Sequence, residues 1–395
     1  MTGHLNTEIP TTYPAFKVAL GVFIGSAAMV LMGVQPILIG LFSDHLHLDL
    51  TQGGWVLAAE QFGGAAGALL GYWIATRMRW TYSIAGACVL AAAVNIATAY
   101  AGGFGVIAAA RFASGLATTV AYTVAVYFLG HTSKPDRVYG LLMILTTLIF
   151  SADAIALPLL NEHYGYTVAV GSVAVWFAAA LVAAIMLPKG PIGTKSVEGP
   201  RISNPDGRPS VAAAALIGAF LMELSVFAVW GFLERVGRGD GLSDEQVGFA
   251  IGIGVLGGIP GGLAPAIIGA RFGRISMIAL SAIMLVASYV ALASALHMMG
   301  YVLWITILNV GWVLGLTYYM SLTVAHDPDG RYTRLMAFSQ MLAAGVGPAC
   351  SALAMNNDQL SPIFVIASIS ATAGLVAVIS ADKMGAVGAR RARRV

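Results

Sequence analysis

The sequence predicts an all-α membrane protein whose twelve transmembrane helices form two pseudo-symmetric six-helix halves. Apolar residues make up 58% of the 395 positions and charged residues only 10%, against roughly 25% charged in soluble domains. At least ten apolar runs reach the roughly 20 residues that cross a bilayer core. A glycine-rich pattern also recurs in the second half. Together these observations exclude an ordinary soluble protein.

The internal repeat joins two glycine-rich apolar runs, each ending in a short basic turn. Gly63, Gly67 and Arg79 return in the second half as Gly258, Gly262 and Arg274, all at the same offset along the chain. Repetition of this kind is typical of secondary transporters, whose two halves move around a central site. The repeat therefore predicts a transporter rather than a single unrepeated bundle.

Each predicted span is a long apolar run bounded by polar or basic residues. The spans cover 16–42, 52–75, 80–100, 104–130, 138–160, 166–187, 209–233, 245–270, 275–296, 299–325, 333–355 and 361–381. The stretch between the sixth and seventh spans is polar and has no apolar periodicity. It predicts a flexible cytoplasmic linker at 188–208, between an N-terminal half, 1–187, and a C-terminal half, 209–395.

The basic residues segregate to one side of these spans. Only Arg235 and Arg238 fall on the opposite side, and Arg111 lies within a span. The crowded side carries Lys17, Arg77, Arg79, Lys134, Arg137, Lys189, Lys195, Arg201, Arg208, Arg271, Arg274, Arg331, Arg334, Lys383, Arg390, Arg391, Arg393 and Arg394. By the positive-inside rule this side is cytoplasmic. We expect a multi-pass protein of a bacterial inner (plasma) membrane, with both termini cytoplasmic.

The C-terminal tail is basic and carries four of these arginines between positions 390 and 394. It could contact anionic lipid headgroups, or act only as a solvated anchor of the topology. We favour the second interpretation.

Three short motifs stand at defined places on these spans. The turn after the second span contains Gly71, Arg77 and Arg79, and the turn after the eighth contains Arg271, Gly273 and Arg274. The fourth span reads Arg111-Phe-Ala-Ser114-Gly115, and the eleventh contains Gly345-Val-Gly347-Pro348. Ala75 stands two positions before Arg77 in the first turn, and Ala270 stands immediately before Arg271 in the second.

These motifs resemble those of the major facilitator superfamily, where the turn reads Gly-x-x-x-Asp-Arg-x-Gly-Arg-Arg and the fourth span carries Arg-x-x-Gln-Gly. The resemblance covers nearly the whole chain and implies the major facilitator fold and alternating access. It implies a gating role for the two turns, although alanine replaces the acid at Ala75 and Ala270. A glycine- and proline-rich fifth span, typical of drug/proton antiporters, is absent from 138–160.

Ionisable residues within the spans call for an explanation, because inserting each one into the membrane costs at least about 2.5–3.5 kcal/mol of free energy. Four stand out: Glu60, Arg111, Asp153 and Glu223. The helix rise of about 1.5 Å per residue places the first three about 10–12 Å from the outer boundary. We expect a cluster at one level of the first half.

Our hypothesis is that Arg111 pairs with Glu60 or Asp153, while the other acid takes up and releases a proton. A carboxyl group pulled between desolvation and a neighbouring arginine can change protonation when a pocket opens to water. The alternative is a permanent ion pair that only pins helices together. Glu223 either lines the central cavity, contacting substrate or a proton, or bonds to a neighbouring helix.

Candidate substrate contacts lie in the second half, besides Arg111 and Glu223. Asn309 and Gln340 are polar residues within spans, for which interhelical hydrogen bonding is the favoured alternative. Tyr318 and Phe338 are aromatic residues placed deeper than interfacial anchors. We include all four as candidates.

The sequence pattern does not indicate a site for a metal, a cofactor or a nucleotide. Cys88 and Cys350 lie in apolar runs, where thiols pack. None of the seven histidines falls deep in a span, and no Gly-x-x-x-x-Gly-Lys-Ser/Thr loop occurs. We expect no cofactor, no metal and no enzymatic activity. The expected partners are a small-molecule substrate, protons and membrane lipid, without nucleic acid, and the chain is expected to be a monomer.

The predicted function is proton-coupled transport of a small organic solute. The missing antiporter motif favours uptake, and an unpaired Arg111 would favour an organic or aromatic acid. Proton-driven efflux of drug-like amphiphiles is the alternative, supported by 16 methionines. A polytopic membrane sensor or enzyme is the alternative from another class. It would usually carry His/Asp clusters or a soluble domain, and the sequence has neither.

Overall fold

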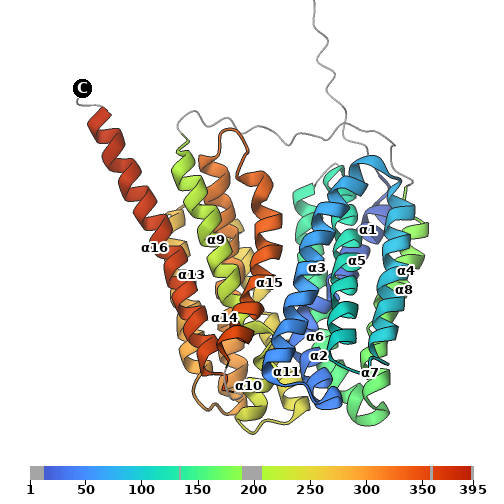
Figure 1. The fold of residues 1–395 in the computed structure, drawn as a ribbon. Helices are drawn as coiled ribbons and strands as arrows, with labels where there is room; N and C mark the ends of the chain where they lie inside the picture. The colour runs from blue at the N-terminus through green and yellow to red at the C-terminus, as the bar shows by residue number, and fades with distance from the viewer. Residues whose placement is uncertain (1–12, 133–134, 189–206, 356–358, 393–395) are drawn as a thin grey trace, which may run out of the picture.

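The computed structural model describes residues 13–132, 135–188, 207–355 and 359–392. Figure 1 shows two groups of roughly parallel helices standing side by side. The first comprises α1 (Ala15–Ala28), α2 (Val30–Leu46), α3 (Leu50–Arg77), α4 (Trp80–Thr98), α5 (Phe104–Gly130), α6 (Pro135–Tyr164), α7 (Tyr166–Ser172) and α8 (Ala174–Ile185). The second comprises α9 (Pro209–Trp230), α10 (Leu233–Gly239), α11 (Asp244–Val255), α12 (Gly258–Ile268), α13 (Arg274–Leu292), α14 (Met298–His326), the 3₁₀ turn η1 (Thr333–Leu335), α15 (Met336–Ala354) and α16 (Ser361–Ala392).

The helices confirm the predicted all-α membrane architecture. In the described ranges, 11 helical segments are long and apolar enough to cross a membrane. The remaining long helix, α3, has 28 residues. Its glycines and the polar pair Glu60 and Gln61 make it less apolar, yet it packs between α5 and α15 within the bundle. Counting α3, the chain matches the predicted twelve spans.

Several spans differ from their predicted form because their helices are interrupted or extended. The first span continues to Leu46 but breaks at Met29, whose amide donates to Ser26 O at 3.2 Å, in a turn tighter than the α-helix. The eighth breaks between Val255 and Gly258, where glycines weaken the helix. The seventh ends at Trp230 and is followed by the separate short helix α10. The last helix continues to Ala392, into the predicted tail.

Equivalent residues of the two halves are separated by an offset that is one residue shorter than the offset between the repeated glycines in the sequence. Four pairs of equivalent helices share one offset between their first residues: α1 and α9, α3 and α11, α4 and α13, and α5 and α14. We call this offset, which places Ala15 on Pro209, the structural register. Both α3 and α11 begin with a capping box, formed by Asp49 with Gln52 and by Ser243 with Gln246. The second half has glycine pairs at 257–258 and 261–262, so each first-half glycine has two possible matches. The sequence comparison matched the second glycine of each pair, which makes its offset one residue too long.

Matching glycines bring matching helices into backbone contact. A Cβ at these glycines would meet carbonyl oxygens of α5 or α14: Gly63 faces Phe112, Gly67 faces Leu116, Gly257 faces Thr306 and Gly261 faces Val310. Glycines and partners alike follow the structural register. Small residues of this kind let membrane helices approach closely. On α5, Gly115 lies against the backbone of Glu60 in the same way.

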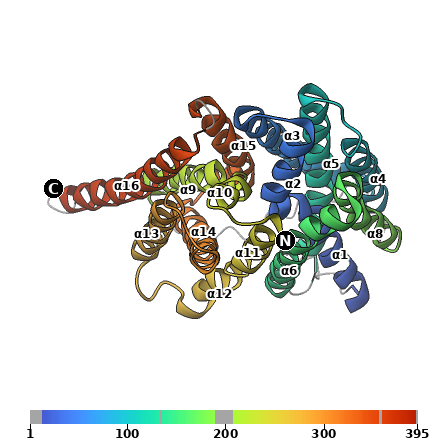
Figure 2. The same ribbon diagram turned by 90° about the horizontal axis from the view of Figure 1, so that it is seen from below.

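The halves are joined most firmly at one end of the bundle. We call the end that carries the start of α1, the end of α8 and the start of α9 the terminal end, and the opposite end the latch end (Figure 1). Hydrogen bonds and ion pairs between the halves gather toward the latch end, where Trp230, Arg235 and Arg238 bind residues of α2. Nearby, Gly54 lies against Ala352 and Gly248 against Pro158. Figure 2 shows the two groups of helices from this end.

Gly115→Ala is expected to lower the thermal stability of the purified protein. The added methyl would meet the Glu60 backbone, and overpacking of this kind costs about 1–3 kcal/mol. Gly86→Ala is the matched control, since a Cβ there meets nothing within 4 Å. Thermal unfolding in detergent measures both variants. Equal melting temperatures for Gly115→Ala and the wild type would contradict the close α3–α5 approach.

Candidate functional site

A fully buried arginine organises the first half. The side chain of Arg111, on α5, is 1% exposed, and its Nε lies 3.6 Å from Glu60 Oε2 on α3. Its Nη2 donates to Asn95 Oδ1 on α4 at 2.8 Å. The guanidinium carbon lies 5.9 Å from the centre of the Phe42 ring on α2. One charge thus links α5 to three other helices of the first half, α2, α3 and α4.

The surrounding sequence explains how this charge is held. Asn95 donates through Nδ2 to Ser114 Oγ at 2.9 Å and to Ala91 O at 2.8 Å, which leaves its Oδ1 for Arg111. Ser114 is the serine that replaces glutamine in the fourth-span motif. The neighbouring Gly115 lets α3 approach until Glu60 reaches the guanidinium. Arg111 Nε and Nη1 make no hydrogen bond within the described structure, so the pair is not locked by a full set of bonds.

The ion pair has no counterpart in the second half. In the structural register, Glu60 corresponds to Gly254 and Arg111 to Ile305. A Cβ on Gly254 would meet the side chain of Ile305, so these two positions also touch. The repeat therefore keeps the helix contact and changes its chemistry from apolar packing to an ion pair. This asymmetry marks the first-half pair as more than a by-product of the fold.

Asp153 does not join the predicted cluster. Its Oδ2 accepts a hydrogen bond from Trp176 Nε1 on α8 at 2.7 Å, and the described chain contains no salt bridge between it and Arg111. The helix rise placed the three groups at one level but not on one face. Arg111 faces α3 and α4, whereas Asp153 on α6 faces α8. Of the two candidate partners, Glu60 is the one that pairs.

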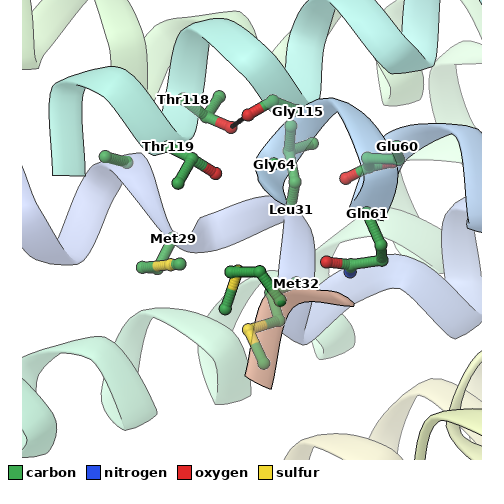
Figure 3. Close-up of a pocket in the computed structure, with 11 residues that line it drawn as sticks. Met29, Leu31, Met32, Glu60, Gln61, Gly64, Gly115, Thr118 and Thr119 are labelled. Atoms are coloured by element: carbon green, nitrogen blue, oxygen red, sulfur yellow. Dashed lines mark hydrogen bonds between the residues drawn. The ribbon is translucent and has the colours of Figure 1, made fainter. Parts of the chain in front are cut away.

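The carboxylate of Glu60 also borders a small, partly open pocket. Figure 3 shows Glu60 and Gln61 along one side, Thr118 and Thr119 above, and Met29 and Met32 below. The lining residues are Ala28, Met29, Leu31, Met32, Glu60, Gln61, Gly64, Gly115, Thr118, Thr119 and Met341. Met341 belongs to α15 of the second half, so the pocket lies where the halves meet. Arg111, which pairs with Glu60, does not line the pocket.

Glu223 occupies a different setting in the second half. It is 2% exposed, and its two carboxyl oxygens accept from Trp312 Nε1 at 3.1 and 3.2 Å. Trp312 lies edge-on to Phe227, with ring centres 5.5 Å apart, and 6.1 Å from Trp230. Trp230 Nε1 donates to Met32 O at 2.9 Å. This aromatic cluster therefore reaches across to a residue of the pocket wall.

The other predicted substrate contacts bond within the second half, and none lines this pocket. Asn309 Nδ2 donates to Ile305 O of its own helix at 2.9 Å. Gln340 Nε2 lies 3.7 Å from Met320 Sδ. The Tyr318 hydroxyl donates to Gly269 O at 2.7 Å. Phe338 is half-buried on α15.

The two predicted gating turns lie at the terminal end. Arg77 stacks on Trp73 at 5.3 Å, and Arg274 Nε donates to Ser321 Oγ at 2.8 Å. Gly273 caps α13 with φ of 82°, and a Cβ on Gly71 would meet Thr123. Arg79 and Arg271 are exposed. In the parts of the chain that the structure covers, none of these four arginines has an acidic partner within 4 Å, as expected with alanine at 75 and 270.

A charged cluster at the latch end was not foreseen. Asp44 on α2 binds Arg235 Nη2 at 2.7 Å and Arg238 Nη1 at 2.9 Å, across the two halves. Arg238 also binds Asp244 at 2.8 Å, and Arg235 binds Glu234 at 3.1 Å. Gly40 allows the fit, because a Cβ there would overlap the Glu234 carboxyl. Arg235 and Arg238 were the outliers of the charge pattern, and this exception was the available signal.

Comparison with known proteins decides the family. A family model described as Major Facilitator Superfamily matches residues 18–352. The chain belongs to the Major Facilitator Superfamily. Among curated proteins, the sequence has no significant match.

Solved structures of other transporters share the fold of this superfamily member. The nucleoside transporter NupG aligns over 94% of this chain and 99% of its own, with 12% identity and a TM-score of 0.70. A peptide transporter POT in complex with sulfate aligns over 97% and 96%, with 13% identity and a TM-score of 0.75. A bacterial homolog to the human lysosomal transporter Spinster, inward-facing and unoccupied, aligns over 95% and 97%, with 13% identity and a TM-score of 0.66. At these identities the likeness concerns the fold alone.

Arg111→Met is expected to destabilise this transporter by about 3–5 kcal/mol, because it leaves the Glu60 carboxylate buried without its cation. Adding Glu60→Gln to Arg111→Met should recover most of that loss, since both charges are then absent. Asp153→Asn is the control that leaves the ion pair intact. Unfolding in detergent or lipid provides the measurement. Strictly additive losses in the double variant would contradict the pairing.

The latch end is expected to open more readily as pH rises. Burial raises the pKa of Glu234 to about 7, against the lowering effect of Arg235, with Asp44, Arg238 and Asp244 contributing less. In an open state, hydration would return the carboxyl toward its usual value of 4.5. The closed state therefore holds the proton more tightly. Its added stability is complete below pH of about 4.5 and is lost as pH rises through about 7.

Spin labels at Tyr164 and Met299, both exposed at the latch end, would measure this opening after Cys88 and Cys350 are replaced by serine. The population with a long inter-label distance should grow between pH 5 and pH 8. Glu234→Gln should flatten the pH dependence and favour the short distance. An unchanged pH profile in Glu234→Gln would refute the role of this carboxyl.

Proposed function

We propose that the protein is a proton-coupled secondary transporter, which moves a small organic solute by alternating access between its two halves. The observation that carries this proposal is the Glu60–Arg111 pair. It is buried within the first half, yet its carboxylate borders a pocket at the contact between halves. A charge that costs several kcal/mol in a membrane thus borders a space between the halves, which alternating access would open to each solution in turn.

The pair couples a proton to this movement through the charge of Glu60. When Glu60 is ionised, the Arg111 guanidinium balances its charge and also donates a hydrogen bond to the Asn95 amide oxygen. When Glu60 is protonated, Arg111 loses this attraction and keeps its bond to Asn95. Protonation changes the net charge of the enclosed pair from neutral to positive, so an open and a closed cavity hold the proton with different affinity. Differential proton affinity between states is what coupling requires.

Asp153 and Glu223 extend the proposed proton-coupling set. Each carboxyl accepts a bond from a tryptophan N–H, and neither has a basic partner within 4 Å among the described residues. Asp153 belongs to the first half and Glu223 to the second, so the two halves each hold a carboxyl that can bind a proton. Glu60 remains the primary site because it alone of the three lines the pocket.

The orientation follows from the basic residues, most of which fall at the terminal end. We place this end in the cytoplasm by the positive-inside rule, in a bacterial inner membrane. The latch end then faces outward, and its ion pairs close the outer side. In this orientation the structure corresponds to an inward-facing state.

The direction of transport has two candidates. The lack of a glycine- and proline-rich fifth span supports uptake. The case for a carboxylate substrate required an unpaired Arg111, and the pairing with Glu60 removes that support. Efflux of amphiphiles is favoured by a separate observation: three methionines, Met29, Met32 and Met341, line the pocket. Flexible thioethers adapt to varied apolar ligands.

Glu60→Gln is expected to abolish proton-driven accumulation in reconstituted vesicles while leaving exchange between equal solute pools. The amide keeps the shape of the side chain but cannot carry the proton. Solutes would come from a thermal-shift screen of organic acids and lipophilic cations. Retained exchange shows that the variant is folded.

Two further variants sharpen this test. Glu162→Gln, an exposed acid at the end of α6, is the matched control and should behave as wild type. Asp153→Asn should reduce accumulation less than Glu60→Gln. Full proton-driven accumulation by Glu60→Gln would overturn the proposed coupling.

A further inference from the structure

We propose that the solute is an amphipathic organic cation, held between the Glu60 and methionine wall of the first half and the Glu223–Trp312 pair of the second. The proposal rests on the proposed transport function and names the substrate class. It is supported by three separate observations: the balance of buried charge, the pocket wall, and the structural register of the halves.

The balance of charge inside the spans is negative. Three carboxyl groups, those of Glu60, Asp153 and Glu223, are buried or half-buried there among the described residues, and Arg111 is the one guanidinium buried with them. Arg111 is already paired with Glu60 and does not line the pocket. A low-dielectric space with this balance attracts cations and repels anions. This argues against the organic acids that the sequence favoured.

The pocket wall suits an apolar molecule with one positive group. Glu60 is its only charged lining residue. Met29, Met32 and Met341 supply soft, polarisable surface, and Thr118, Thr119 and Gln61 supply oxygens that accept from an N–H group. Figure 3 shows these polar groups and the side chains of Met29 and Met32 around the same space.

The structural register gives the second half an equivalent pair of positions, which lie next to the pocket wall but do not line the pocket. Glu223 and Trp312 correspond to Met29 and Thr118 of the first half, and both of these line the pocket. Trp312 is half-buried, and its neighbour Trp230 is bonded to Met32 O of the pocket wall. Indole faces attract ammonium and related cations, and the Glu223 carboxylate lies at the Nε1 edge of the Trp312 ring.

A cation at these carboxyls competes with protons. When the cation binds, a protonated carboxyl releases its proton to the solution and becomes the carboxylate that balances the ligand. No other bond forms or breaks. Binding of one therefore excludes the other, and the two species move in opposite directions. This exclusion favours the efflux candidate over uptake.

Binding of tetraphenylphosphonium to the detergent-purified full chain tests the proposal. Tetraphenylborate is the matched control, because it has nearly the same size and shape with the opposite charge. We expect saturable tetraphenylphosphonium binding whose affinity increases with pH, by up to about tenfold per pH unit where one proton is displaced. Tetraphenylborate should show no saturable binding.

Variants identify the site. Glu223→Gln and Trp312→Leu should each weaken tetraphenylphosphonium binding about tenfold or more, whereas Trp312→Phe, which keeps an aromatic face, should weaken it less. Trp73→Leu, at an exposed position on α3, should bind as wild type. Melting temperatures and elution profiles confirm that each variant is folded. Equal saturable binding of both probes, or binding that depends on neither pH nor Glu223, would overturn the proposal.

Failure of this inference can be told apart from failure of the proposed function. If tetraphenylphosphonium does not bind but Glu60→Gln still abolishes proton-driven accumulation of another solute, the substrate class is wrong and the coupling stands. If tetraphenylphosphonium binds as expected but Glu60→Gln keeps full accumulation, the coupling is wrong and the cation site stands.

Discussion

Burial of one guanidinium constrains the whole first half. Arg111 has no exposed surface. The groups that α2, α3, α4 and α5 place beside it must therefore be compatible with a buried positive charge. Glu60 supplies the charge and Asn95 the hydrogen bond. Gly63 and Gly115 let α3 and α5 approach until this is possible. The pair then borders the contact between halves, where a change in its charge affects how the halves meet.

The repeat of the two halves shows what is structural and what is specific in this transporter. Helix starts, capping boxes and glycine contacts recur in both halves, so they belong to the scaffold. The charged groups do not recur. Glu60 and Arg111 are matched by Gly254 and Ile305, and the second half carries Glu223 and Trp312 instead of Met29 and Thr118. A symmetric frame therefore holds an asymmetric site, which is what a directional, coupled process needs.

The sequence predicted the fold, because hydropathy depends on local spacing alone, and it predicted that Arg111 pairs with a first-half carboxylate. It did not settle whether Glu60 or Asp153 pairs with Arg111, since that depends on which faces of neighbouring helices pack together. It also missed the latch cluster. Asp44 and Arg235 are far apart in the chain and meet only after the halves dock. The doubled glycines of the eighth span displaced the repeat by one position for the same reason: only the contact with α14 shows which glycine of each pair is equivalent.

The central claim is that the Glu60 carboxyl gains and loses a proton beside Arg111. Infrared difference spectra of the reconstituted protein, recorded as pH is lowered, test it most directly. Among the carbonyl bands of protonated buried carboxyls, one should be present in the wild type and in Asp153→Asn but absent from Glu60→Gln. A set of bands that is unchanged in Glu60→Gln would contradict the account.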